Sequence, residues 1–271
     1  MSNVIDRCLL AGALAVLETA NARHKAATAR TLADDWRSGG LILGATAIAP
    51  NRPARPDRPE LRPPRKMPRR KRAGGERGRI ALLHALAHIE LNAIDLACDM
   101  IVRFADQAPD ATFFDDWVKV AGEEALHFTL LADRLSAFDA AYGDLPAHDG
   151  LWQAAGATAD DVLARLAVVP MVLEARGLDV TPGMIADLER GGDRSSAAIV
   201  ERIYADEIGH VAIGNKWFAT FCESRGQDPA VAWPEIVRAR YRGFLKPPFN
   251  DEARQAAGLS ADLYRSLAAP D

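Results

Sequence analysis

The sequence predicts an all-α protein whose centre is a four-helix bundle. Apolar residues recur with a helical period through most of the 271 residues, and runs of β-branched residues are scarce. Four of the expected helices each place one glutamate in the middle of an otherwise apolar stripe. An apolar fraction of 49% and a charged fraction of 26% are ordinary for a globular protein and allow a sizeable core.

Four parts are expected along the chain. They are an N-terminal helical segment (1–50), a connector rich in proline and arginine (51–78), the bundle (79–225) and a C-terminal helical extension (226–271). The first part should hold an extra helix over 4–35, closed by Gly39 and Gly40. The prolines of the connector forbid a continuous helix or a central strand, so it should be extended.

The connector is strongly basic. Between Asn51 and Arg79 there are 12 Lys/Arg and 3 Asp/Glu, a local charge of +9, so the net charge of −4 leaves −13 on the rest of the chain. Such a segment attracts phosphates, but it contains no aromatic residue to stack on bases. We therefore favour a structural strap, with arginines paired to acidic helices of the same chain, over a nucleic-acid partner.

The helical period predicts the elements that follow the connector. Thr181 is the expected N-cap of a short helix, with Pro182 at its first helical position. Asp193 or Ser195 should cap the long helix after it, and a loop with a short terminal helix should follow Phe244. The expected helices span 79–105, 111–142, 158–177, 182–190, 193–224 and 229–243.

The cysteines and the hydropathy of the sequence indicate the cellular compartment of the protein. Cys8, Cys98 and Cys222 are far apart and form no C-x-x-C pair, so a disulfide framework is not expected and a reducing cytoplasm fits best. The apolar N-terminal stretch is interrupted by Glu18 and reads as a helix rather than a signal peptide. No apolar run is long enough for a transmembrane helix, and no membrane partner is expected.

Two E-x-x-H motifs and two further glutamates form the candidate site. The motifs are E-A-L-H at 124–127 and E-I-G-H at 207–210, and residues three apart lie on one face of a helix. Glu90 and Glu174 lie on apolar stripes of two other expected helices. A lone glutamate on such a stripe is most often a structural residue, and a lone E-x-x-H arises easily by chance. Their joint occurrence on four helices is much more specific.

Four buried carboxylates need compensating positive charge. Each lone buried charge costs several kcal/mol, whereas two divalent cations offset four carboxylates and neutral imidazoles complete the ligand set. Glutamates alternating with E-x-x-H on facing helices are the ligand pattern of di-iron and di-manganese bundles. Oxygen and imidazole ligands favour iron or manganese over zinc. The expected ligands of two iron ions, with manganese as the alternative, are Glu90, Glu124, His127, Glu174, Glu207 and His210.

Several neighbours are candidates for supporting roles. Asp206 and Glu123 directly precede ligand glutamates and could orient a metal-bound histidine, although a solvated face suits Glu123 equally well. Tyr204 and Arg176 could line a substrate pocket, or serve core packing and an ordinary salt bridge. His88 shares a helix face with His84, Asp95 and Asp99, and that face reads more readily as an inter-helix or outer surface.

Four segments together resemble a known family. They are HALAHIELNAIDLACDM, GEEALHFTLLADRL, LEARGLDVTPGM and IYADEIGHVAIGNKWF, and with the preceding Pro/Arg-rich segment they are similar to the ferritin-like family known as domain of unknown function 455. The resemblance covers roughly residues 50–225. It implies a ferritin-like bundle with Glu124 and Glu207 bridging two metals, Glu90 and Glu174 as terminal carboxylates, and one histidine on each metal. A more distant similarity to tRNA-modifying di-iron hydroxylases is analogy only.

Three functions follow from this reading. The first is an O₂-activating di-iron oxidoreductase or hydroxylase acting on a small-molecule substrate. The second is metal handling, as a ferroxidase or store, which the roughly 100 residues outside the bundle disfavour. The third is a tRNA-modifying hydroxylase that binds RNA through 51–79. A homo-oligomer is compatible with each of them.

Overall fold

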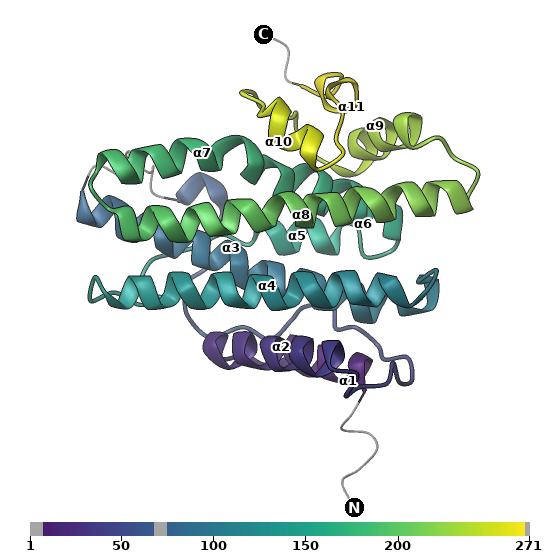
Figure 1. Ribbon diagram of the computed structural model, residues 1–271, viewed down its shortest axis with the longest axis horizontal. Helices are drawn as coiled ribbons and strands as arrows, with labels where there is room; N and C mark the ends of the chain where they lie inside the picture. The colour runs from purple at the N-terminus through teal and green to yellow at the C-terminus, as the bar shows by residue number, and fades with distance from the viewer. Residues whose placement is uncertain (1–7, 68–74, 269–271) are drawn as a thin grey trace, which may run out of the picture. The chain divides into compact units, whose positions relative to one another are not determined.

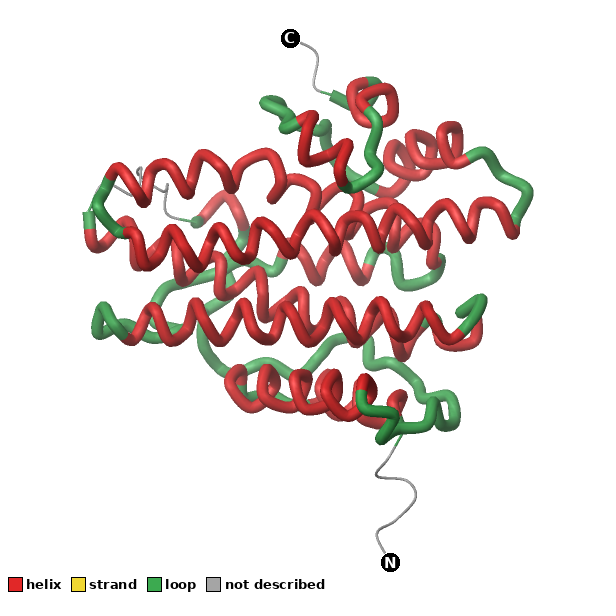
Figure 2. The backbone as a smooth tube through the Cα atoms, viewed as in Figure 1, coloured by secondary structure: helices red, strands yellow, loops and turns green. Residues whose placement is uncertain are grey.

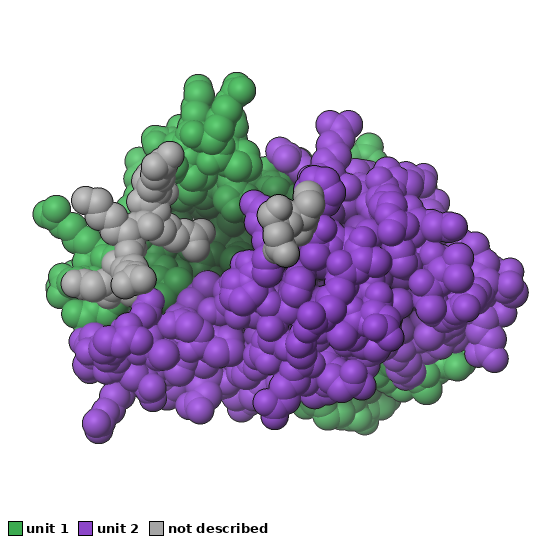
Figure 3. Space-filling view, turned by 90° about the horizontal axis from the view of Figure 1, so that it is seen from above, with its two compact units in different colours: residues 1–152 green, residues 153–271 purple. Residues whose placement is uncertain are grey.

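The computed structural model describes residues 8–67 and 75–268. Within these ranges the regular structure is helical and no strand is present, which confirms the predicted all-α class (Figure 2). The start of the expected N-terminal helix and the basic run Arg69–Arg72 lie outside the described residues. The chain forms two compact units, Met1–Trp152 and Gln153–Asp271, which Figure 3 colours separately.

The first unit begins with two helices where one was predicted. α1 spans Leu9–Glu18 and α2 spans Ala22–Arg37, so the expectation of a single helix over 4–35 was wrong. The chain turns between them because Asn21 leaves the helical conformation and its side chain accepts a hydrogen bond from His24 N at 3.0 Å, which caps α2. As predicted, glycine follows the end of α2, and Gly39 has a φ of +73°.

The core of the first unit is the pair α3, Glu76–Arg103, and α4, Ala111–Ser136. The two helices pack along each other, with α2 against α4 and α1 against α3 (Figure 1). Asp110 caps α4 by accepting from Thr112 N at 2.8 Å. The short helix α5, Gly150–Gly156, was not predicted.

Among the described residues, one helix has the length and the hydropathy of a membrane span, although no such span was expected. α3 is long and apolar enough to cross a bilayer, but 78% of its most apolar window is buried within the structure. Burial of this kind is expected for the core helix of a soluble protein, because a long core helix needs apolar residues around most of its surface.

The described part of the connector is a strap along the first unit. Two backbone hydrogen bonds join it to the rest of the unit: Ala54 N donates to Leu17 O at 2.8 Å, and Arg62 N donates to Ala147 O at 2.8 Å. Arg52 pairs with Asp149 at 2.6 Å and Arg55 pairs with Asp95 at 2.9 Å. Further along lies a single 3₁₀ turn, Pro64–Lys66. These pairs agree with the predicted strap.

The second unit opens with a long, interrupted helix. α6, Val162–Val168, continues through a π-helical turn, Val169–Glu174, into α7, Ala175–Arg190. Pro182 lies inside α7, so the prediction that a new helix begins there was wrong. Pro182 has no N–H to donate to the carbonyl of Leu178, and the side chain of Asn250 donates to that oxygen instead at 3.1 Å. This substitute donor allows α7 to continue.

The long helix α8, Arg194–Ser224, packs against α7 and the π turn. Asp193 caps it by accepting from Ser196 N at 3.1 Å, one of the two predicted caps. A Cβ on Gly214 of α8 would lie 2.4 Å from Cβ of Pro170, so only glycine permits this close approach. The unit is completed by α9, Pro229–Arg240, α10, Asp251–Ala256, and α11, Ala261–Arg265 (Figure 1).

Candidate metal centre

Three of the predicted ligands meet in the first unit. Glu90 comes from the middle of α3, and Glu124 and His127 come from one face of α4. Nδ1 of His127 lies 3.4 Å from Oε2 of Glu90 and 3.3 Å from Oε2 of Glu124. All three side chains are buried, as the apolar stripes on both helices predicted. The apolar residues of the same two stripes are buried as well: Leu83, Ala87, Ile94, Ala97, Ile101, Trp117, Val120, Ala121, Phe128, Leu131 and Leu135.

The electrostatics of this triplet indicate a shortage of positive charge. Burial raises the pKa of Glu90 well above its usual value, and the neighbouring charge of Glu124 raises it further. Burial alone would lower the pKa of His127, but its hydrogen bonds to Glu124 and Glu90 outweigh that effect and raise it to about 11. A bound cation would supply the positive charge that the two buried carboxylates lack.

The triplet has the geometry of a metal-binding group. One ligand atom each from Glu90, Glu124 and His127 lie within 4.8 Å of one another. Two carboxylates and one imidazole in a dry environment suit iron or manganese better than a thiolate-preferring metal. This buried Glu/His group could therefore hold a metal ion.

The second unit carries the other three predicted ligands. Glu207 and His210 lie one turn apart on α8, with Oε1 of Glu207 3.6 Å from Nδ1 of His210. His210 is fully buried, whereas the side chain of Glu207 is 14% exposed. Glu174 is half-buried and closes the π-helical turn before α7. Such turns are rare and are frequently found at functional sites.

Two of the supporting candidates make ion pairs on their own helices. Oδ2 of Asp206 accepts from Nε of Arg202 at 2.6 Å, one turn earlier on α8. Glu123 lies 3.8 Å from Nζ of Lys119 on α4, and its side chain is 24% exposed. These ion pairs match a partly solvated helix face.

Tyr204 and Arg176 both hold the C-terminal part of the second unit. The hydroxyl of Tyr204 accepts from Asn250 Nδ2 at 2.9 Å. Arg176 donates to the carbonyls of Lys246 and Pro248 at 2.5 and 3.1 Å. Through these contacts both side chains fasten the segment before α10 to α7 and α8.

His88 belongs to a buried polar seam on α3 that sequence reasoning undervalued. We define this seam as His84, His88, Asn92, Asp95 and Asp99, which recur every three or four residues and are all buried. Of the two structural readings left open for this face, burial rules out the outer surface and agrees with an inter-helix face. α2 and the strap cover it, and Lys25 and Arg55 both pair with Asp95. The sequence contains a sign of this burial. Positions 88, 92, 95 and 99 have helical spacing, and the connector that precedes them is rich in arginines that can pair with the two aspartates.

Within the seam, hydrogen bonds fix the tautomer of His88. Nε2 faces the carbonyl of His148 at 3.1 Å, so it carries the proton, and Nδ1 accepts from the hydroxyl of Tyr142 at 2.9 Å. Burial lowers the pKa of His88 to about 4 despite the favourable carbonyl contact. The residue is thus a neutral structural link between α3 and the loop that follows α4.

Comparisons with known proteins agree with the sequence resemblance. A chain from Haemophilus influenzae described as "Uncharacterized protein" is 41% identical over 210 residues, which cover 76% of this chain and 73% of that one. No solved structure matches. A family described as "Protein of unknown function (DUF455)" matches residues 18–265, a wider range than the four quoted segments. Because that match covers most of the sequence, the chain belongs to the DUF455 family.

Proposed function

We propose that this protein is a two-metal carboxylate oxidoreductase of ferritin-like architecture that activates O₂ to hydroxylate or oxidise a small molecule. The observation that carries the proposal is the buried triplet of Glu90, Glu124 and His127 in the first unit. Three polar side chains in a dry core, two of them acidic, are costly unless a cation accompanies them.

The second unit supplies a matching set of ligand types. Each unit offers one isolated glutamate and one E-x-x-H pair on a long helix. A triplet of two carboxylates and one imidazole is half of what two metal ions require in a bundle of this kind. The proposal is that these six side chains are the protein ligands of one pair of iron ions, with manganese as the alternative metal.

Each ligand has a proposed role. As the resemblance to the ferritin-like family implies, Glu124 and Glu207 would be ligands shared by both ions, with one histidine on each ion. Glu90 and Glu174 would each bind one ion from the side. A bound pair of iron ions would supply the redox chemistry that O₂ activation needs. The protein would hold the ions in place and exclude water around them.

Metal analysis tests this proposal. Protein reconstituted anaerobically with Fe(II) should hold about two ions per chain, and exposure to O₂ should change its optical spectrum. Glu207→Gln should lose both ions because a bridge is removed. Glu201→Gln provides the matched control, since Glu201 is an exposed glutamate on the same helix.

The outcomes separate the candidate functions. Trace metal in a well-folded, reconstituted wild type would refute the two-metal centre. Repeated oxidation of added Fe(II), with ferric iron accumulating in the protein, would favour metal handling over substrate oxidation. Retention of both ions by Glu207→Gln would place them elsewhere in the molecule.

A further inference from the structure

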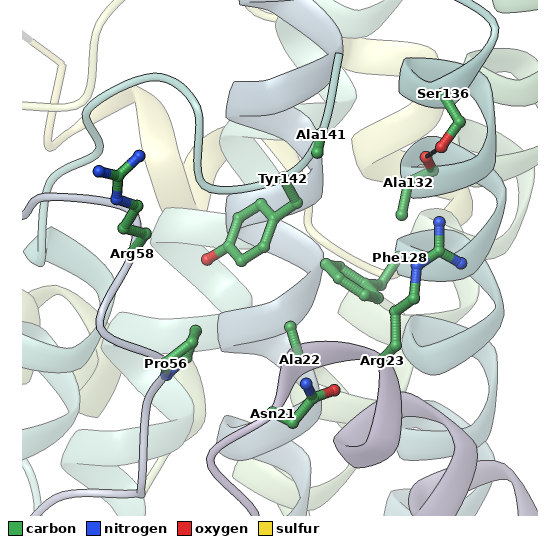
Figure 4. Close-up of a pocket in the computed structure, with 10 residues that line it drawn as sticks. All are labelled: Asn21, Ala22, Arg23, Pro56, Arg58, Phe128, Ala132, Ser136, Ala141 and Tyr142. Atoms are coloured by element: carbon green, nitrogen blue, oxygen red, sulfur yellow. Dashed lines mark hydrogen bonds between the residues drawn. The ribbon is translucent and has the colours of Figure 1, made fainter. Parts of the chain in front are cut away.

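A pocket of about 230 Å³ opens within the first unit (Figure 4). It is formed by the start of α2, the strap, the second half of α4 and the loop after α4. None of the predicted metal ligands lines it. We propose that this pocket binds a small aromatic carboxylate.

Aromatic rings form the apolar wall of the pocket. The rings of Phe128 and Tyr142 meet edge to face, with centroids 5.3 Å apart and planes at 87° (Figure 4). Ala132 and Ala141 add small apolar surfaces beside them. A flat ring in the ligand could therefore stack on one aromatic residue and meet the edge of the other.

The polar seam holds this wall in place. The hydroxyl of Tyr142 donates to Nδ1 of His88 at 2.9 Å, and its ring stacks on His84 at 5.3 Å between centroids. The next residue, Gly143, donates its N–H to Nε2 of His84 at 2.9 Å. Because buried groups fix both the ring and its loop, the pocket exists before a ligand arrives, and binding need not order it.

The charge of the pocket favours an anion. Two arginines line it and no carboxylate does. Arg23 is already paired with Asp133 at 2.8 Å, but among the described residues the guanidinium of Arg58 has no carboxylate partner. Figure 4 shows the two arginines on opposite sides of the aromatic pair, with the guanidinium of Arg58 turned away from the rings, so this exposed side chain would swing inward to meet a ligand. A planar carboxylate matches the guanidinium fork of Arg58.

Two further features agree with a small anion. Ala22 and Arg23 are the first residues of α2, where backbone N–H groups lack intrahelical acceptors and the helix dipole favours negative charge. The volume of about 230 Å³ leaves room for a ring with one carboxylate.

Binding of 4-fluorobenzoate to the full chain, followed by ¹⁹F NMR, tests the proposal. We expect saturable binding, with uncharged 4-fluorobenzyl alcohol binding about tenfold more weakly because it lacks the charge-assisted contact. Arg58→Gln should weaken benzoate binding by about tenfold. Arg62→Gln should leave it unchanged, because Arg62 lies on the same strap but pairs with Glu60 outside the pocket.

The titrations include a chelator, so their result does not depend on the metal centre. Melting curves for both variants establish that each is folded, and Arg58 is exposed enough for its replacement to be tolerated. The proposal is overturned if no saturable signal appears at about 10 mM ligand. It is equally overturned if acid and alcohol bind alike, or if both variants lose the same affinity.

Discussion

The side chain of Asn250 donates a hydrogen bond of 3.1 Å to the carbonyl oxygen of Leu178, the oxygen that Pro182 leaves without a helical donor. A residue 72 positions away thus repairs the break that proline makes in α7. The same side chain donates to Tyr204 and accepts from Ala253 N at the start of α10. The C-terminal segment is therefore part of the reason that α7 is one helix.

This relationship predicts a specific coupling between two positions. Asn250→Ala should lower the free energy of unfolding by about 2 kcal/mol, because it removes a helix cap and leaves the Leu178 carbonyl unpaired. Pro182→Ala restores an N–H in the helix, so the same Asn250 replacement should cost about 1 kcal/mol less in that background. Urea unfolding of the wild type, the two single variants and the double variant measures the coupling in a double-mutant cycle. Additive effects would show that the two residues do not act on the same carbonyl.

A second prediction concerns the strap. Arg55 pairs with the fully buried Asp95 and also donates to Asn92 at 2.7 Å. Arg55→Gln should destabilise the protein by about 2 kcal/mol or more, because it leaves a buried carboxylate with one cation fewer. Chemical denaturation measures the loss. Arg62→Gln, which breaks an exposed pair on the same strap, is the control and should leave the midpoint unmoved. Equal midpoints for both variants would contradict this account.

A third prediction is a pH dependence through His84. Burial lowers the pKa of His84, and the charge of Asp144 only partly opposes this. The unfolded chain therefore binds the proton at a higher pH than the folded chain, so stability falls as pH drops below about 6.5. Protonation would also prevent Nε2 from accepting the Gly143 N–H.

His84→Gln tests this sign, because glutamine keeps an acceptor and does not titrate. The difference in unfolding free energy between pH 7 and pH 5 should be smaller in the variant than in the wild type. Denaturant titrations at both pH values provide the comparison, which cancels the contribution of every other group. An unchanged difference would mean that His84 does not contribute to the pH response.

A fourth prediction follows from the metal proposal. Ligand binding to the folded state alone raises stability, by about 2.7 kcal/mol when the free ion is at a hundred times its Kd. Fe(II) or Mn(II) should therefore raise the melting temperature, and a chelator should reverse the change. In Glu124→Gln the metal-induced shift should disappear, whereas Glu201→Gln should retain it. A melting temperature that changes with neither metal nor chelator would argue against a buried metal site.

A fifth prediction concerns nucleic acid. Arg52 and Arg55 are engaged within the first unit, so we expect the connector to act as a strap rather than as a phosphate cradle. RNA should then bind no more tightly to the wild type than to a variant with Arg69, Arg70, Lys71 and Arg72 replaced by Gln. Fluorescence anisotropy from about 50 to 200 mM salt makes the comparison. Tight, salt-sensitive binding that the variant loses would reverse this expectation.

Periodicity and spacing determined much of the fold and part of the candidate site. Helical period is a local property, so α3, α4, α8 and α9 were predictable to within a few residues at most of their ends. The E-x-x-H spacing fixes Glu124 and His127 on one helix face, because three residues make almost a full turn. The apolar stripe around Glu90 predicted its burial for the same reason.

Tertiary structure decided the features that depend on distant partners. Pro182 reads as a helix start until the donor from Asn250 is known, since no local pattern reveals a substitute donor 72 residues after Leu178. Likewise, the pattern around His88 and Asp95 suits an outer surface and an inter-helix face equally, and the packing of α2 and the strap, which supply Lys25 and Arg55 as partners of Asp95, decides between them. The sequence by itself determined which side chains share a face. Only packing determined what each face meets, because desolvation and pairing depend on groups brought together from distant positions in the chain.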